Sequence, residues 1–204
     1  MERLLEIKDL HVQYETDVGV IYAVNGLDIL VNKGETLGLV GETGAGKTTS
    51  ALSVLKLLPD RIGKITSGSI VFDGTDIILA SETEMLKIRG NKVSMIFQDP
   101  LSSLNPVLTI GKQLDEAFIV HHSCDQNEAK TRSIEMLTKV GIPSPEKRYG
   151  EYPHQLSGGM RQRVMIAMAL AQNPSLIIAD EPTTALDVTI QAQIMELMKE
   201  MKEK

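Results

Sequence analysis

Eight consecutive residues, GETGAGKT at positions 41–48, have the composition of a phosphate-binding loop. They fit the pattern G-x-x-x-x-G-K-[ST] at every fixed position. Glycines allow successive backbone N–H groups to converge on phosphate oxygens, and a helix that begins there presents its positive dipole end to the same anion. We expect Lys47 to reach the β- and γ-phosphates and the Thr48 hydroxyl to bind Mg²⁺. The residues predicted to bind the nucleotide are Gly41, Glu42, Thr43, Gly44, Ala45, Gly46, Lys47, Thr48 and Thr49.

Two carboxylates end a short apolar run, LIIADE at positions 176–181. Open α/β sheets bind ligands at the carboxyl ends of their strands. Asp180 is therefore predicted to hold Mg²⁺, generally through water, and Glu181 to act as general base on an attacking water. Gln98 follows another apolar run, KVSMIF at 92–97, and its amide oxygen could contact both the Mg²⁺ and that water. The alternative for the acidic pair is that it caps the next helix.

The segment LSGGMRQR at positions 156–163 predicts a second anion site. Ser157, Gly158 and Gly159 stand at an expected helix start, where a hydroxyl, N–H groups and the positive dipole end suit a γ-phosphate. The chain already has one phosphate loop, so the most economical explanation is a site that closes on a nucleotide held by another copy or a paralogue. An ordinary capped helix remains the alternative at this point.

Two tyrosines could stack on adenine, because an aromatic face accepts a purine ring without reading its hydrogen-bonding edge. Tyr14 is the preferred candidate and Tyr22 is its rival. Packing within a strand is the alternative for both.

The composition indicates one α/β domain with an inserted subdomain, because 204 residues with 42% hydrophobic content are too few for two domains of ordinary size. The net charge of −6 argues against a broad basic surface for nucleic acid or anionic lipid. No apolar run approaches the roughly 18 residues of a membrane span, and we expect a soluble, cytosolic chain. Cys124 is the only cysteine, which excludes an internal disulfide.

The N-terminal half reads mainly as strands. Alternation predicts antiparallel strands at 4–14 and 20–31, and a short apolar strand at 35–40 that enters the glycine loop. A helix is expected over 48–58, ended by Pro59. Residues 68–79 resemble a hairpin that turns at Asp73-Gly74.

The C-terminal half reads as helices around two buried strands, at 92–97 and 175–179. Amphipathic helices are expected from about 106 to 149. Asp125 and Glu128 have the spacing of a capping box, and Gly141 followed by Pro143 ends that element. Ser157 is expected to begin another helix.

Taken together, these motifs resemble the nucleotide-binding subunit of an ATP-binding cassette transporter. The matching pieces are GETGAGKT (Walker A), Gln98 (Q-loop), LSGGMRQR (signature), LIIADE (Walker B) and Ala185-Leu186-Asp187 (D-loop). Three longer stretches are similar to the dipeptide, oligopeptide and nickel importer group: FQDPLSSLNPVLTIGKQL, YPHQLSGGMRQR and DEPTTALDVTIQAQI. Met160 stands where the wider superfamily usually has Gln, and the importer group commonly has Met there.

The resemblance implies an α/β fold: a P-loop NTPase core with a mostly parallel sheet, an N-terminal antiparallel β subdomain, and an inserted α-helical subdomain at about 106–160. It implies head-to-tail pairing of two subunits, with Ser157 and Gly159 of one closing on ATP held by Lys47 of the other. A pair of permease subunits, which would dock near Gln98, and a substrate-binding protein would complete an importer. The subunit would lie on the inner face of the cell membrane.

The activity implied is Mg²⁺-dependent ATP hydrolysis that energises uptake of peptides or nickel. A soluble cassette ATPase acting on DNA or ribosomes is the alternative, although such proteins usually carry coiled-coil arms or two cassettes. A nucleotide-sensing module without a transport role is a third reading. The resemblance names neither the cargo nor the choice between homodimer and heterodimer.

One departure concerns the switch histidine, which follows the next strand after the D-loop helix in the family. The chain ends at Lys204, and none of its histidines falls at the matching position: His11, His121, His122 and His154. We therefore expect a truncated product or fragment that binds ATP tightly and turns it over poorly. The last helix has an apolar face that should pack on the core, formed by Ile190, Ile194, Leu197, Met198 and Met201.

Overall fold

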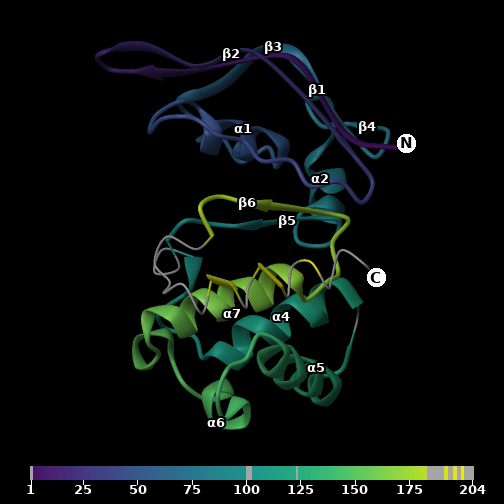
Figure 1. The fold of residues 1–204 in the computed structure, drawn as a ribbon, viewed down its shortest axis with the longest axis vertical. Coiled ribbons are helices and arrows are strands. Elements are labelled where there is room, and N and C mark those ends of the chain that lie inside the picture. Colours follow the sequence, from purple (N-terminus) through teal and green to yellow (C-terminus); the bar gives the residue numbers. More distant parts are fainter. Residues whose placement is uncertain are drawn as a thin grey trace. The chain divides into compact units, whose positions relative to one another are not determined.

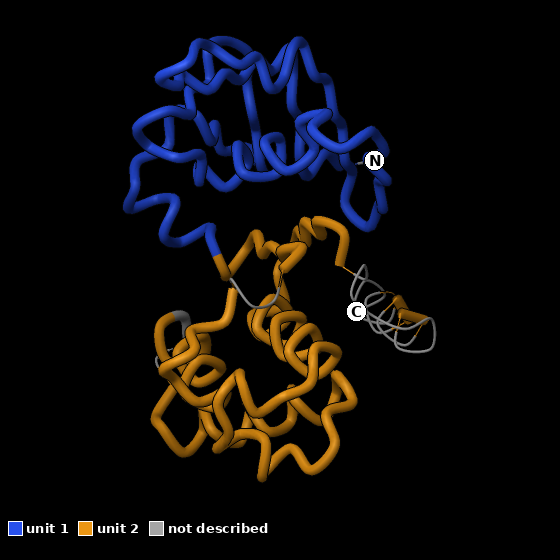
Figure 2. The backbone as a smooth tube through the Cα atoms, turned by 90° about the vertical axis from the view of Figure 1, so that its left-hand side faces the viewer, with its two compact units in different colours: residues 1–89 blue, residues 90–204 orange. Residues whose placement is uncertain are grey.

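The computed structural model describes residues 2–99, 103–122, 124–182, 191–192, 195–196 and 199. The chain divides into two compact units, Met1–Arg89 and Gly90–Lys204 (Figure 2). The D-loop residues 185–187 and the apolar face expected on the last helix lie outside the described residues. The expectation of a single domain with a helical insertion at about 106–160 stays a prediction.

The first unit is built on a four-stranded antiparallel sheet in the order β2-β1-β3-β4 (Figure 1). Its strands are β1 (Arg3–Thr16), β2 (Gly19–Asn32), β3 (Gly63–Phe72) and β4 (Thr75–Asp76). Ile7 on β1 pairs with Ile29 on β2 and with Ile70 on β3. The two N-terminal strands predicted from alternation are therefore confirmed.

An irregularity in β1 keeps its apolar side chains in the core. The register shifts between Ile7 and Leu10, and Asp9 between them has φ 45°. An extra residue in a strand changes which positions face inward. Consequently Leu5 and Ile7 before the shift and Leu10 after it are all buried.

The hairpin predicted at Asp73-Gly74 is present between β3 and β4. Val71 pairs with Asp76 and Phe72 with Thr75. Asp73 and Gly74 have φ of 45° and 79°, and two central residues with positive φ define the type I′ turn that suits strand twist.

Helix α1 (Lys47–Val54) follows the glycine loop, as expected, but it ends earlier than predicted. Lys56 adopts the left-handed region with φ 53°. Its N–H donates to the Ser53 carbonyl, and the Leu57 N–H donates to the Leu52 carbonyl. These two bonds form a Schellman motif, so Lys56 ends the helix and Pro59 does not.

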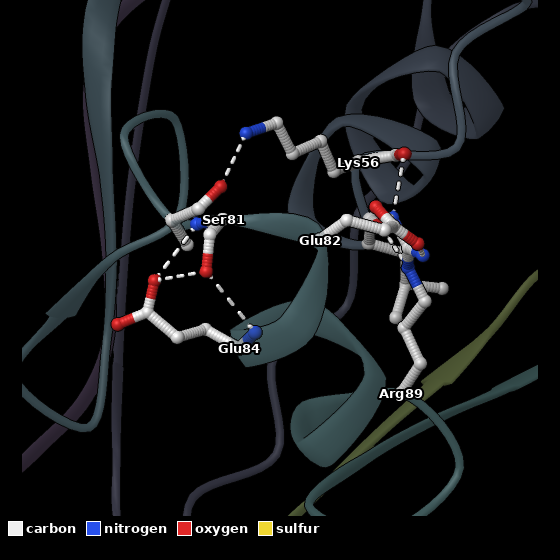
Figure 3. A network of polar contacts seen from close by, with 7 residues as sticks. Lys56, Ser81, Glu82, Glu84 and Arg89 are labelled. Atoms are coloured by element: carbon white, nitrogen blue, oxygen red, sulfur yellow. Dashed lines mark hydrogen bonds and ion pairs between the residues drawn. The ribbon is translucent and has the colours of Figure 1, made fainter.

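The C-terminal end of α1 is tied to α2 (Glu82–Ile88) by the side chain of Arg89, the C-cap of α2 (Figure 3). Arg89 donates from Nε to the Leu55 carbonyl at 2.7 Å and from Nη2 to the Lys56 carbonyl at 3.0 Å. Its Nη1 pairs with Glu82 at 2.5 Å. Cations stabilise the negative end of a helix, so Arg89 holds the end of the helix that carries the phosphate loop.

Helix α2 begins with a complete capping box, visible in Figure 3. The Ser81 hydroxyl accepts from the Glu84 N–H at 3.3 Å, and Glu84 Oε2 accepts from the Ser81 N–H at 2.8 Å. Hydrogen bonds from the Ser81 side chain and backbone lower the pKa of Glu84, because they favour the ionised carboxylate.

The strand expected at 35–40 is absent from both described sheets, so that prediction was wrong. Three of its apolar side chains are exposed, with Val40 at 95% of its full accessible surface. A buried parallel strand needs neighbours that come from distant parts of the sequence. The described strands of the first unit form only antiparallel pairs.

The second unit contains a parallel pair, β5 (Val93–Ile96) and β6 (Leu176–Ala179), with Val93 opposite Leu176 and Ile96 opposite Ala179. All four residues of β5 are buried, as predicted. The expectation of a buried β6 was wrong, because its side chains are half-buried or exposed. The pair is the described part of the expected parallel sheet.

The second unit also contains the helices α4 (Ile110–His122), α5 (Gln126–Lys139), α6 (Pro145–Tyr149), the 3-10 helix η1 (Pro153–Gln155) and α7 (Gly158–Leu170). These helices pack around an apolar core, to which the end of β5 also contributes. Its most buried members include Ile96, Ile110, Leu114, Leu137, Val164 and Ile166. Helices predicted between 106 and 149 are therefore confirmed.

Helix α5 begins and ends where the sequence indicates. Asp125 Oδ1 accepts from the N–H groups of Asn127 and Glu128 at 2.8 and 2.9 Å. The Glu128 carboxylate pairs with Arg132 at 2.6 Å. The bonds that Asp125 accepts are therefore the half of the expected capping box that forms. Gly141, with φ 71°, ends the helix.

Candidate functional site

The glycine loop before α1 depends on backbone conformations that favour glycine. Gly44 and Gly46 have φ of 84° and 85°, and Gly46 is the N-cap of α1. A Cβ on Gly46 would lie 2.3 Å from the Ala23 carbonyl oxygen. The third glycine of the motif therefore lets the loop pass directly against β2.

The Lys47 side chain folds back onto the first two residues of this loop. Its Nζ donates to the carbonyl oxygens of Gly41 at 2.7 Å and Glu42 at 3.0 Å. An ammonium has three donors, and the two carbonyls hold its charge beside the N-terminus of α1. A cleft of about 460 Å³ adjoins the loop, and Tyr22, Asn25, Val40, Gly44, Gly46 and Lys47 are among its lining residues.

These features fit the phosphates of a nucleotide. The backbone at Gly46 passes too close to Ala23 to leave room for a Cβ. The ammonium of Lys47 lies against the start of the loop, and α1 begins directly after the loop. Thr48, on the first turn of α1, is exposed and is the residue expected to reach Mg²⁺.

The two candidate tyrosines differ in position. The Tyr14 hydroxyl is 3.1 Å from the Thr49 hydroxyl, which ties β1 to α1. Tyr22 lines the cleft beside Lys47, and 68% of its surface is exposed. The preference for Tyr14 as the residue that stacks on adenine stays a prediction, and the structure brings Tyr22 to the cleft.

The second unit brings Gln98 and Glu181 together at the carboxyl ends of the parallel strands. Gln98 follows β5 and Glu181 follows β6; Gln98 Nε2 donates to Glu181 Oε2 at 2.9 Å. The Asp180 N–H donates to the Ile96 carbonyl at 2.9 Å, which continues the ladder up to the carboxylates. Parallel strands end at the same edge of a sheet, so the contact follows from the pairing of β5 with β6.

Thr48 lies in the first unit, and Asp180 and Gln98 lie in the second; the expectation that each contacts Mg²⁺ stays a prediction. Within the described ranges, no group of three or more His, Cys, Asp or Glu side chains is placed to hold a metal. Mg²⁺ commonly takes one or two protein ligands and completes its shell with phosphate oxygens and water. A hydroxyl, a carboxylate and an amide oxygen are each oxygen donors of the kind that Mg²⁺ accepts.

Ser157 is the N-cap of α7, and its Oγ accepts from the Met160 N–H at 3.3 Å. Ser157 and Gly158 are exposed, and a Cβ on Gly158 would meet no atom within 4 Å. The helix start predicted for the signature segment is confirmed. Its role toward a nucleotide of another subunit stays a prediction.

Two buried polar residues in the signature segment were not predicted as functional from the sequence. Gln162 Nε2 donates to the Pro182 carbonyl at 2.6 Å, directly after Glu181. Arg163 Nη1 donates to the carbonyls of Val140 and Gly141 at 2.9 and 2.8 Å, at the C-terminal end of α5. The available signal was their position within a run that is otherwise apolar, where polar side chains must find partners.

No helix in the described part of the chain combines the length and the apolar character that crossing a membrane requires.

Known proteins resemble this chain in sequence and in fold. The oligopeptide transport ATP-binding protein OppD of Bacillus subtilis (strain 168) is 52% identical over 202 residues, which are 99% of this chain and 56% of that protein. The dipeptide transport ATP-binding protein DppD of the same organism is 50% identical over 204 residues, covering 100% of this chain and 61% of that protein. The chain thus spans 56% to 62% of the length of the curated relatives that head the comparison.

The dimeric post-hydrolysis structure of the ATP-binding cassette MJ0796, bound to ADP and Pi, superposes with a TM-score of 0.88 at 31% identity. The match covers 98% of this chain and 83% of that chain. The fold is therefore that of the cassette ATPases, a P-loop NTPase core with an antiparallel β subdomain and a helical subdomain. The model of the family described as "ABC transporter" matches residues 24–184, and with sequence and fold in agreement the chain belongs to that family.

Proposed function

We propose that the chain is the ATP-binding and ATP-hydrolysing part of an importer that takes up peptides. The relatives named above are described as oligopeptide and dipeptide transport ATP-binding proteins. The observation that carries hydrolysis is the hydrogen bond between Gln98 and Glu181, because it places a carboxylate and an amide together at the ligand-binding edge of the parallel strands.

The residues of the first unit bind the nucleotide in this proposal. Lys47 supplies the positive charge over the phosphates, and the loop around Gly44 and Gly46 lets the backbone approach them. Mg-ATP, when bound, supplies the phosphoryl group that water attacks. The Thr48 hydroxyl would supply an oxygen ligand to the Mg²⁺ of that nucleotide.

The residues of the second unit activate water. Glu181 accepts a proton from the attacking water at one carboxylate oxygen. Gln98 fixes the other oxygen, Oε2, through the 2.9 Å hydrogen bond and thereby orients the carboxylate. Such orientation matters because a general base must lie within hydrogen-bond reach of the proton that it abstracts.

The proposal includes a second cassette and a membrane permease. Ser157 and Gly159 of one subunit would close on ATP bound at Lys47 of the other, as a homodimer or with a related subunit. The assembly would lie on the inner face of the cell membrane. The dimeric state of the MJ0796 cassette supports such pairing.

Glu181→Gln tests hydrolysis separately from binding. We expect ATP affinity to be kept, steady-state hydrolysis to fall about a hundredfold or more, and dimers to persist in Mg-ATP. Glu135→Gln, at an exposed glutamate on α5, is the matched control and should hydrolyse ATP like the parent. A Glu181→Gln protein that hydrolyses ATP at the parent rate would contradict the proposal.

The transport role has its own test. Deletion of the coding sequence should abolish uptake of a labelled di- or oligopeptide, and the tagged chain should co-purify with integral membrane subunits. Stimulation of the ATPase by DNA without any membrane partner would favour the nucleic-acid ATPase instead.

A further inference from the structure

Glu181 is held from two sides by glutamines of different elements. Gln98, after β5, binds the carboxylate itself. Gln162, on α7, donates from Nε2 to the carbonyl of Pro182 at 2.6 Å. Because that carbonyl belongs to Pro182, the bond restrains the backbone one residue beyond Glu181.

The backbone at Glu181 needs such support. Its φ is 47°, in the left-handed region that a glutamate rarely adopts. A strained conformation of this kind persists only where its surroundings determine it, and it is common at functional sites. Gln98 constrains the end of the side chain, and Gln162 constrains the chain that follows.

Gln162 lies on the helix that carries the signature residues. Ser157 is the N-cap of α7, and Gln162 follows it by five residues, about 7.5 Å along a helix axis. Residues 162–167 are all buried, and the Gln162 side chain is 1% exposed. A close-packed interior transmits displacement, so a movement of Ser157 along or around the helix axis carries Gln162 with it.

We propose that Gln162 is a positioning residue that couples the position of α7 to the orientation of Glu181 in the same chain. The inference rests on the proposed function, because it assigns Glu181 the role of general base. Its consequence is communication between two sites: a phosphate contacted at Ser157 alters the base that serves the nucleotide held by this chain. The signature segment then contacts a phosphate at its N-cap and supports Glu181 through Gln162, about 1.4 turns later.

Gln172 provides a matched control for this role. Its side chain is 6% exposed, and its Nε2 donates to the Ala117 carbonyl at 2.6 Å. The Oε1 atoms of Gln162 and Gln172 both lack a hydrogen-bond partner among the described residues. The two glutamines thus make the same kind of buried bond, and they differ in which backbone accepts it.

The first experiment compares Gln162→Met with Gln172→Met in the full chain. Methionine keeps the length of the side chain and removes the donor. We expect Gln162→Met to lower the kcat of ATP hydrolysis about ten- to a hundredfold, with the KM for ATP within about twofold of the parent. Gln172→Met should keep the parent kcat, and thermal unfolding should show similar destabilisation of both variants. Gln162→Leu serves as a second variant if the first does not fold.

The second experiment asks whether Gln162 acts through Glu181. Single-turnover hydrolysis is measured for Gln162→Met, Glu181→Gln and the double variant. If Gln162 positions Glu181, the double variant is no slower than Glu181→Gln alone. A further tenfold loss in the double variant would overturn the inference, as would a parent-like kcat for Gln162→Met or an equal loss for Gln172→Met.

A third readout separates this inference from the proposed function. Amide hydrogen exchange in the segment 176–182 should accelerate in Gln162→Met and remain unchanged in Gln172→Met, without any need for hydrolysis. Accelerated exchange in a protein that never hydrolyses ATP would uphold the support of Glu181 and overturn the proposed function. If the parent hydrolyses ATP but exchange in this segment is unchanged in Gln162→Met, the inference is overturned and the proposed function stands.

Discussion

Gln98 and Glu181 are 83 positions apart in the sequence, and a hydrogen bond of 2.9 Å joins Nε2 of the first to Oε2 of the second. Gln98→Ala removes the donor that orients the carboxylate. We expect kcat to fall about ten- to a hundredfold while ATP affinity stays close to that of the parent, because Lys47 and the glycine loop are untouched.

Steady-state kinetics combined with binding of a fluorescent ATP analogue checks this prediction. Gln126→Ala, at an exposed glutamine of α5, is the control and should leave both quantities unchanged. A loss of ATP affinity equal to the loss of kcat would assign Gln98 to nucleotide binding and not to the orientation of Glu181.

The two central glycines of the phosphate loop should respond differently to alanine. Gly44 and Gly46 share a positive φ, which costs an alanine about 1–2 kcal/mol at either position. A Cβ on Gly44 meets no atom within 4 Å, whereas a Cβ on Gly46 would lie 2.3 Å from the Ala23 carbonyl oxygen. Gly46→Ala should therefore lower the free energy of unfolding by more than Gly44→Ala and displace the loop from β2.

Denaturant unfolding and ATP binding, measured on both variants, test this difference. The Gly46→Ala protein should lose most of its ATP affinity. If both variants unfold at the same denaturant concentration, the close approach of the loop to Ala23 is not present in solution.

Arg163 should contribute to stability far more than an exposed arginine does. Its guanidinium caps the C-terminal end of α5 through the carbonyls of Val140 and Gly141. Arg163→Met leaves the buried Val140 carbonyl and the part-buried Gly141 carbonyl without this donor and should cost about 2–3 kcal/mol of unfolding free energy. Arg132→Ala, which breaks the exposed pair with Glu128, should cost within about 0.5 kcal/mol. Equal effects in denaturant unfolding would contradict the capping role.

The elements that the sequence predicted correctly are those set by local chemistry. Asp73-Gly74 supplies two residues that accept positive φ, and the hairpin turns there. Asp125 offers its carboxylate to the first N–H groups of α5, and Gly141 accepts the left-handed conformation that ends it. In each case the determining groups lie within a few residues of one another.

The predictions that failed depended on less specific or more distant interactions. Lys56 ends α1 in a conformation that lysine seldom adopts, so Pro59 was the more visible signal. The apolar run at 35–40 predicted a strand, yet a strand also needs neighbours from elsewhere in the chain.

The candidate site likewise contains residues that short motifs predict and residues whose partners only the fold reveals. Short motifs predict the glycine loop, Glu181 and Gln98 as chemically suited residues. The contacts of Gln162 and Arg163 involve partners about twenty residues away, and no pattern in the sequence pairs them. Buried polar side chains in a helix signal that partners exist, and the fold identifies them.

Tyr149 gives the helical unit a predictable dependence on alkaline pH. Burial raises the pKa of Tyr149 well above its usual value near 10, and the hydrogen bond that its hydroxyl donates to Asp115 adds to the shift. In the unfolded chain the phenol ionises near pH 10, whereas the folded state keeps its proton. Above that pH the unfolded state binds fewer protons than the folded state, so the free energy of unfolding falls as pH rises.

Denaturant unfolding of Tyr149→Phe between about pH 8 and pH 11 tests this prediction. The variant should be less stable than the parent at the lower pH, since Asp115 loses a donor, and its stability should decline less steeply above pH 10. Ser133→Ala removes the other donor to Asp115, at 2.6 Å, without removing a phenol. Because it keeps the Tyr149–Asp115 pair, this control should be destabilised and retain the steep alkaline decline. The same alkaline slope in Tyr149→Phe and the parent would show that the phenol of Tyr149 is not held protonated by the fold.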